Sequence, residues 1–518
     1  MHVNLTGQIP EGDSMIRRWL REYGTIVSAV AVLQFVTYMY LFTLPIFTNH
    51  TFPSATIHPY PQYRAVGRWL ADVVVWLQGG SGVAPLLMTG SALLQAVNGV
   101  LLARLAGVTR RRDTLLVAAA LSLYPAFVDY YSFPVDQLYF VLADTAVLSG
   151  ILIFRRSPTA WRSVIACGAL FLGAIACYQP KISLIALLAL VSVLIVPPRS
   201  PTASASAPQR VQQHLRTHAI LAVTISVAGV LYFLSTRLVW EPLAGSRTYT
   251  NTIQQAISAA ALAYPTCATR LLLPVDYLPE PLAWIPPALL VAGVVAAIAY
   301  TRRHGWLMLA VAIAALALMP LALQAAQIIN ENTWAAAGRI LAADGYATTF
   351  LMACVLCALP GAAPVRWAIG LLCAGLVVTG SQQSNAAAFK TVYDVNLMNR
   401  ILSRAEPLLN AAGQKPRALV MMGAEPRFRW SDFVRDEPRG IHLSSNTLAP
   451  YRQVLTLNFF AGWSAFRSPS KAEVEDAVRT MADRPYWPAE GSVYLHNDTV
   501  VVVMEPYRPE SPVTWTRD

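Results

Sequence analysis

The feature that most constrains this chain is a succession of long apolar runs separated by short polar turns. Of the 518 residues, 55% are hydrophobic and only 13% are charged, a composition typical of membrane proteins and not of soluble enzymes. The runs predict a mainly α polytopic membrane protein of about eleven transmembrane helices. The expected spans are Thr25–Phe47, Val83–Leu105, Thr114–Val128, Leu138–Phe154, Val164–Cys177, Ile182–Val196, Ala219–Ser235, Leu282–Tyr300, Trp306–Leu323, Leu341–Leu359 and Trp367–Thr379.

Arginine-rich turns alternate with arginine-poor turns along the chain. Examples are Arg110–Arg112, Arg155–Arg156 and Arg302–Arg303, so much of the net charge of +11 lies in short connections. This is the pattern of positive charge on the cytoplasmic side of a membrane. It places the N-terminus in the cytoplasm and accounts for the basic charge without a nucleic-acid partner. An odd number of spans then places the C-terminus on the outer side.

The hydropathy changes after Gln382. We therefore expect residues 1–385 to form a transmembrane domain and residues 386–518 to form a small soluble α/β domain. The expected elements of that domain are a helix at Ala388–Leu409, a strand at Ala418–Met422, helices at Leu448–Phe460 and Lys471–Met481, and a hairpin of Val493–Leu495 with Val500–Glu505 across Asn497 and Asp498.

The first outward loop carries polar residues that neither flanking span could bury. It contains His50 and Arg64 and leads into an amphipathic segment with Arg68 and Asp72. In a helix, Arg64, Arg68 and Asp72 would share one face, because they are four residues apart. Such a stripe at a membrane surface suits a phosphate-linked lipid. The alternative is a surface helix whose arginines reach the lipid headgroups.

Further polar residues occur at the outward ends of other spans. They are Asp129, Asp136, Gln179, Lys181, Glu331, Asn332 and Arg339. Each has a structural explanation: a solvated loop for Asp129 and Glu331, a helix cap for Asp136, a membrane-surface anchor for Lys181 and Arg339. Their convergence on one side nevertheless indicates a site, because ionisable groups at membrane depth are costly.

The cysteines predict no disulfide framework and no zinc site. Cys354 and Cys357 have C-x-x-C spacing but lie inside an expected span, where they are interpreted as packing residues. The carboxylates form no tight cluster in the sequence. No metal or other cofactor is therefore expected.

Four short motifs carry a resemblance to a known family: GRWL at Gly67–Leu70, YSFPVDQL at Tyr131–Leu138, ACYQPKISL at Ala176–Leu184, and AGRIL at Ala337–Leu341. The chain resembles the multispanning bacterial O-antigen glucosyltransferases of the serotype-converting type, in the GT-C superfamily. The resemblance implies a polyprenyl-phosphate-linked sugar as donor and a glycan acceptor at the periplasmic face of the inner membrane. One departure is clear: such enzymes carry acidic residues early in the first outward loop, where this chain has Asn49 and His50.

The expected function is transfer of a sugar from polyprenyl phosphate to a periplasmic or cell-surface glycan such as O-antigen. Such a transfer needs a base for the acceptor hydroxyl and cations for the leaving phosphate. The base candidates are Asp136, Asp129, Asp72 and His50, in that order; the phosphate candidates are Arg64, Arg68, Lys181 and Arg339. Gln179, Glu331 and Asn332 are further binding candidates.

Two alternatives remain open at this stage. A lipid-linked glycan flippase or polymerase would also handle these lipids, but a flippase should line a path through the bilayer with polar groups. A membrane-anchored glycan-binding protein would place its activity in residues 386–518.

The predicted topology can be tested with a reporter enzyme fused after Gln382. Alkaline phosphatase, which is active only outside the cytoplasm, should be active in this fusion, because the arginine pattern places residues 386–518 in the periplasm. The same fusion with a reporter that works only in the cytoplasm should be inactive. The opposite pair of results would overturn the number of spans and the side assigned to the site.

Overall fold

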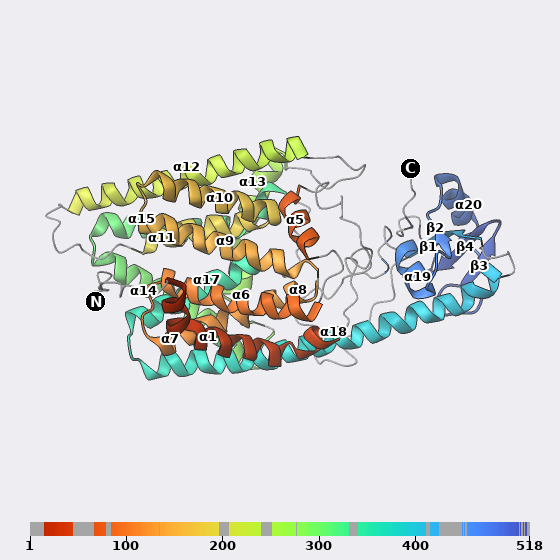
Figure 1. Ribbon diagram of the computed structural model, residues 1–518, viewed down its shortest axis with the longest axis horizontal. Helices are drawn as coiled ribbons and strands as arrows, with labels where there is room; N and C mark the ends of the chain where they lie inside the picture. The colour runs from red at the N-terminus through yellow and green to blue at the C-terminus, as the bar shows by residue number, and fades with distance from the viewer. Residues whose placement is uncertain are drawn as a thin grey trace.

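The computed structural model shows a mostly helical chain with one small sheet (Figure 1). It describes residues 15–44, 67–78, 84–133, 135–195, 207–239, 251–275, 277–330, 340–410, 415–423 and 453–506, with the single positions 448, 450, 508, 511, 513 and 514. His50, Arg64, Glu331, Asn332 and Arg339 lie outside the described residues.

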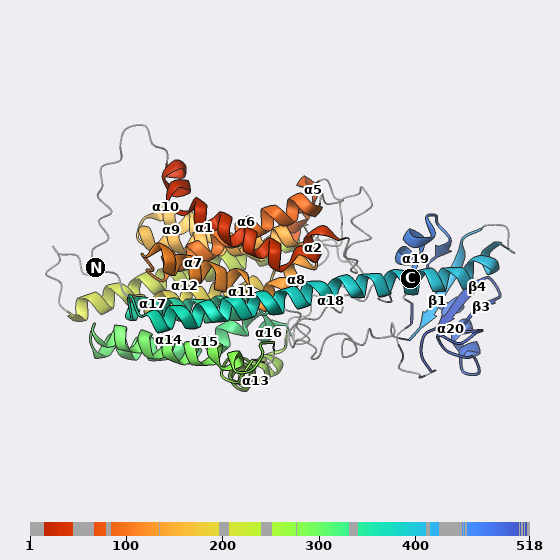
Figure 2. The same cartoon turned by 90° about the horizontal axis from the view of Figure 1, so that it is seen from below.

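The helical part is a bundle of long helices that run along the long axis of the molecule (Figures 1 and 2). Its longer helices are α1 (Met15–Thr37), α6 (Ala84–Leu105), α7 (Arg111–Ser122), α9 (Gln137–Arg156), α10 (Trp161–Cys177), α11 (Lys181–Leu194), α12 (Ala207–Val239), α13 (Ile253–Leu271), α14 (Ile285–Arg302), α15 (Trp306–Leu323), α17 (Ala342–Ala358) and α18 (Ala363–Asn410). Shorter elements are α2 (Met39–Thr43), α5 (Trp69–Leu77), η1 (Pro125–Phe127), α8 (Val128–Tyr131), η2 (Leu282–Trp284) and α16 (Ala325–Ile329).

Six described helices are long and apolar enough to cross a membrane, and they correspond to six of the expected spans. They are Leu86–Leu105, Gln137–Arg156, Val211–Leu238, Leu282–Arg302, Trp306–Leu323 and Ala363–Leu409. The pair Arg111–Ser122 and Pro125–Tyr131 passes the same test together but is bent by 53°. Shorter apolar helices occur at Trp161–Cys177, Lys181–Leu194 and Ala342–Ala358.

The bundle has two chemically different ends. At one, which we call the basic end, lie the connections that carry Arg110–Arg112, Arg155–Arg156 and Arg302–Arg303. At the other, which we call the distal end, lie α5 and α8, and from this end α18 continues toward the sheet (Figure 1). The alternation predicted from the arginines therefore appears as a separation in space.

Helix α18 joins the bundle to the sheet without interruption. It is 48 residues long, where the sequence predicted a span at Trp367–Thr379 and a separate helix at Ala388–Leu409. The residues between them, Gly380 to Ala387, contain no proline, so nothing forces a break. A Cβ on Gly380 would lie only 2.5 Å from the Thr37 side chain, so this glycine lets α18 approach α1 closely.

The first helix differs from its predicted limits. The first span was expected at Thr25–Phe47, whereas α1 begins at Met15 and α2 follows after Thr37. Helix α13 continues through Pro265 to Leu271. Thr252 and Gln255 form a capping box at the start of α13, which fixes its first turn.

The sheet has four strands in the order β2-β1-β4-β3. β1 (Arg417–Met422) pairs in parallel with β2 (Phe466–Arg467) and with β4 (Thr499–Val503), and β3 (Val493–His496) pairs antiparallel with β4. This confirms the hairpin predicted across Asn497 and Asp498; Asn497 has the positive φ of 51° that such a turn requires.

Helices α19 (Gln453–Ala461) and α20 (Lys471–Met481) accompany the sheet. The limits of α20 match the prediction, and α19 begins five residues later than expected. Leu397, Ile401 and Leu402 of α18 belong to the same buried cluster as Leu419 and Val500 of the sheet. The end of α18 is therefore part of the core beneath these strands.

The start of α20 provides a test that depends on pH. Ser470 and Glu473 form a capping box, and Glu473 also pairs with Arg467 at 2.5 Å. The Arg467 guanidinium lowers the pKa of Glu473 from 4.5 to about 2. Because the pKa of Glu473 is lower in the folded state, the ionised carboxylate stabilises the fold at any pH above its unfolded-state pKa. This stabilisation is lost as the pH falls from about 4.5 to about 2.

We predict that Glu473→Gln speeds hydrogen exchange in the first turn of α20 at pH 6, and that the difference from wild type narrows at pH 2.5. Ser470→Ala should cost about 1 kcal/mol locally. Exchange measured by mass spectrometry on peptides from this region would show both effects. An equal difference at both pH values would contradict the role of the ionised Glu473.

Candidate functional site

The most deeply buried charges in the candidate site form an ion pair at the distal end of the bundle. Lys181 begins α11 and Asp144 lies two turns into α9; the lysine Nζ is 2.5 Å from Asp144 Oδ1. Their exposed fractions are 2% and 0%. The Tyr130 hydroxyl of α8 donates to Asp144 Oδ2 at 3.1 Å, and Lys181 Nζ also contacts that hydroxyl. Three helices are thereby joined through one carboxylate.

The position of Lys181 explains why it needs this partner. A cation in the first turn of a helix faces the positive end of the helix dipole. Burial adds a desolvation cost of several kcal/mol for a lone charge, which an ion pair with good hydrogen bonds offsets. The carboxylate of Asp144 supplies both the charge and the hydrogen-bond acceptors.

An aromatic wall connects this ion pair to Arg68. Lys181 Nζ lies 4.6 Å from the centre of the Tyr130 ring and 5.8 Å from that of Tyr178, while the Arg68 guanidinium lies 4.7 Å from the Tyr178 ring. Arg68 Nε also donates to Gln179 Oε1 at 3.1 Å. Two cations from distant parts of the sequence are thus neighbours across one tyrosine. We call Arg68, Tyr130, Asp144, Tyr178, Gln179 and Lys181 the Lys181 cluster.

Arg68 is positioned by the loop before α5. It is the residue that precedes the helix, with φ −97° and ψ 52°, and α5 begins at Trp69. Arg68 and Asp72 therefore do not share a helix face as predicted, because Arg68 precedes the helix and Asp72 lies in its first turn. The Tyr232 hydroxyl of α12 donates to the Gly67 carbonyl at 3.1 Å and holds this segment against α12.

The predicted base candidates Asp72, Asp129 and Asp136 are all buried at the distal end, with exposed fractions of 3%, 1% and 1%. Asp129 lies in α8 and is buried, so it is not the solvated loop acid that was its structural explanation. Ser132 Oγ donates to Asp129 Oδ1 at 3.3 Å. Asp136 occupies the position before α9, but its side chain makes no capping hydrogen bond.

Lys181 is buried, so it is not the membrane-surface anchor that was its alternative to phosphate binding. The sequence identified the lysine but not its partner Asp144 or the tyrosine Tyr130. A signal was present, because Asp144 is the carboxylate within the expected span Leu138–Phe154, and an acid inside a membrane span indicates a partner or a function. The partner lies 37 residues away, and no local pattern connects the two.

A second ion pair lies at the distal end of the bundle, where α17 begins. Arg270 of α13 meets Asp344 of α17 at 3.0 Å, and with its amide turned, Gln324 accepts from the same guanidinium. Asp344 is buried and Arg270 is mostly buried. This pair fastens α13 to the bundle at the distal end.

Within the described part of the chain, no three His, Cys, Asp or Glu side chains are grouped as a metal site would require. No family model matches the chain, and no curated protein or solved structure matches it either.

The buried ion pair between Lys181 and Asp144 predicts how substitutions at these two residues change the free energy of unfolding. Asp144→Asn and Lys181→Met should each destabilise the protein by about 3–5 kcal/mol, because each leaves one buried charge without its partner. The double variant should recover a large part of this loss. Thermal unfolding of the purified protein in detergent, compared across the four proteins, measures the coupling.

Lys471 and Glu475 provide the matched control. They lie 3.9 Å apart on α20 with side chains 76% and 59% exposed, so the same cycle there should show almost no coupling. Strictly additive losses at Lys181 and Asp144 would show that the buried pair does not act as a unit.

Proposed function

We propose that this protein is a glycosyltransferase of the bacterial inner membrane that moves a sugar from a polyprenyl-phosphate carrier to a periplasmic or cell-surface glycan. The observation that carries this proposal is the convergence of Arg68 and Lys181 with buried carboxylates of α5, α8 and α9 at one end of an apolar helical bundle. The resemblance of the four motifs to O-antigen glucosyltransferases supports the same class of reaction.

The proposal includes eleven membrane crossings. The six apolar helices, the bent pair of α7 with α8, the shorter α10, α11 and α17, and helix α1 would together provide them. Exposed tryptophans support a bilayer between the two ends: Trp161, Trp306 and Trp367 start helices at the basic end, and Trp76 and Trp284 lie at the distal end. In this arrangement residues 386–518 are a periplasmic domain.

The reaction joins the acceptor oxygen to the anomeric carbon of the sugar. The bond from that carbon to the phosphate oxygen breaks, its electron pair remains on the phosphate, and a base takes the acceptor proton. The phosphate therefore gains negative charge as it leaves, and nearby cations stabilise the transition state. The lipid tail would remain in the bilayer, and the phosphate would lie at its surface, where the distal end is placed.

Arg68 is the cation best placed to contact the phosphate directly. Its side chain is only partly buried, and a guanidinium can bind two phosphate oxygens at once. Lys181 is bonded to Asp144 and Tyr130, so its role is to supply positive charge beneath Tyr178 and to position that ring. Arg64 and Arg339 remain additional proposals for this contact.

Asp136 is the preferred base. It lies at the distal end of the bundle, immediately before α9. Asp129, Asp72 and His50 follow as alternatives. The accepting group must reach the acceptor hydroxyl, and Asp136 lies at the end of the bundle that the proposal assigns to the periplasmic surface.

The test is transfer from polyprenyl-phosphate sugars, offered as a panel, to lipopolysaccharide acceptors by the purified protein. Asp136→Asn should fold normally and lose at least about a hundredfold in rate, because a positioned base contributes roughly 10²–10⁴-fold. No loss of capping is expected, since the Asp136 side chain does not cap α9.

Arg68→Ala should reduce use of the donor far more than it reduces stability, whereas Arg237→Ala, a basic control on the distal part of α12, should leave transfer unchanged. Normal turnover in Asp136→Asn would move the base to Asp129, Asp72 or His50. Absence of transfer by the wild type with every donor of the panel would count against the whole proposal.

A further inference from the structure

Beyond the bundle, α18 and the sheet hold each other in a fixed arrangement (Figures 1 and 2). Arg404 of α18 donates to the carbonyls of Pro488 and Ala489 at 2.8 and 3.0 Å and to Ser492 Oγ at 3.1 Å. Its guanidinium also lies 4.6 Å from the centre of the Trp487 ring. These contacts use the donors of Arg404 and fix the orientation of α18 against the segment before β3.

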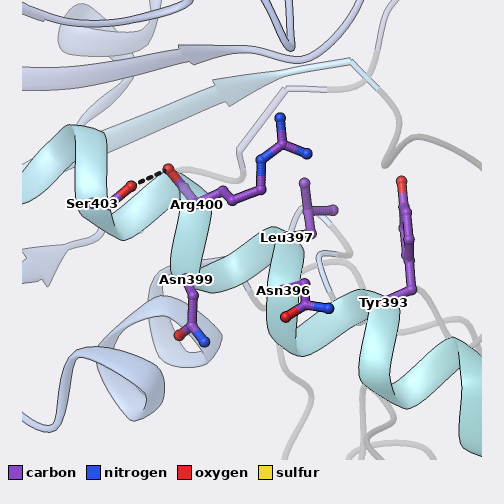
Figure 3. A pocket seen from close by; sticks show the side chains of 6 residues that line it. All are labelled: Tyr393, Asn396, Leu397, Asn399, Arg400 and Ser403. Carbon is purple, nitrogen blue, oxygen red and sulfur yellow. Dashed lines mark hydrogen bonds between the residues drawn. The ribbon is translucent and has the colours of Figure 1, made fainter.

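A cavity of about 570 Å³ opens on α18 within this frame. It is lined by Tyr393, Asn396, Leu397, Asn399, Arg400 and Ser403 (Figure 3). Figure 3 shows Tyr393, Leu397 and Arg400 projecting from one side of the helix, while Asn399 projects away from them. The volume lies in the range of small-ligand sites, which is roughly 300–1,000 Å³.

Three side chains of this lining form no hydrogen bond with a described residue. Neither the Asn396 nor the Asn399 side chain has a hydrogen-bond partner among the described residues. The Arg400 guanidinium lies 4.9 Å from the centre of the Trp487 ring, but it donates no hydrogen bond to a described residue. Arg404, one turn further along, is the opposite case, because three acceptors occupy it.

These side chains match a polyhydroxylated ligand. Each amide offers a donor and an acceptor, as each sugar hydroxyl requires, and the guanidinium adds further donors. The Tyr393 ring offers an apolar face against which the C–H side of a sugar can pack. Leu397 is the one aliphatic residue among the described lining residues, so this part of the cavity does not suit a lipid chain. These described residues include one cation and no carboxylate, which favours a neutral or acidic saccharide over a basic one.

We propose that this α18 cavity binds the saccharide chain of a glycan. The binding site is separate from the Lys181 cluster, and only the identification of the bound chain as the acceptor rests on the proposed function. Leu41 N donates to Ser384 Oγ of α18 at the distal end of the bundle. Asn396 follows twelve residues later, which at 1.5 Å per residue is about 18 Å further along the helix. A chain of several sugars held here could extend back to the distal end.

The test uses the full-length protein in lipid nanodiscs on an array of immobilised bacterial polysaccharide fragments, both neutral and acidic. The wild type should bind a subset of them. The double variant Asn396→Ala/Asn399→Ala should bind these at least tenfold more weakly, because it removes both amides. Both positions are exposed on a helix, and alanine favours helices, so the variant should fold.

Glu406→Gln is the matched control, because it changes a charge on the same helix outside the cavity and should leave binding unchanged. Arg68→Ala should also leave array binding unchanged while it impairs transfer, which separates this site from the Lys181 cluster. Array binding that persists in the double variant, or a wild type that binds no fragment, would overturn the proposal. Amide-dependent binding without any transfer activity would support the cavity and count against the proposed enzyme function alone.

Discussion

The ion pair between Lys181 and Asp144 is the interaction on which the distal end of the bundle depends. It joins α9 to α11, and through Tyr130 it also fixes α8. Burial makes the charges interdependent, since each would carry a large desolvation cost without the other. The same lysine lies beside the Tyr178 ring, which Arg68 covers from its position before α5. Packing in the bundle and the position of a partly exposed arginine are thus controlled by one buried contact.

This arrangement separates structural charges from available ones. Asp144 and Lys181 neutralise each other in the interior, and Arg270 with Asp344 forms a second such pair between α13 and α17. Arg404 is likewise occupied by three acceptors, whereas Arg400 one turn away retains its donors. The chemistry that we propose uses the second kind of residue: Arg68 at the bundle and Arg400 with two amides on α18. In each place, a cation that is already hydrogen-bonded holds neighbouring elements together, and our proposals assign ligand binding to a residue close to it.

Sequence reasoning predicted the parts of this structure that depend on local pattern. Apolar runs predicted the six long apolar helices, two short strand patterns across Asn497 and Asp498 predicted β3 and β4, and clustered arginines predicted the basic end. The placement of Lys181 and Asp136 at the opposite end was also predicted. Residues that meet only in the folded chain could not be paired from the sequence, because nothing near Lys181 indicates that Asp144 is its partner. The predicted limits of helices were wrong where the sequence contains no clear signal. Helix α18 does not stop between Thr379 and Ala388, and α5 starts only after Arg68.

The continuity of α18 has a geometric consequence. Because one unbroken helix of 48 residues connects the bundle to the sheet, the height and the rotation of the sheet are both set by residue count. Each residue added between Ser384 and Asn396 would raise the sheet by about 1.5 Å and turn it by roughly 100° about the helix axis. An insertion of two residues would therefore direct the α18 cavity toward the opposite side of the molecule. The length of α18 therefore fixes both the distance and the orientation of the sheet relative to the bundle.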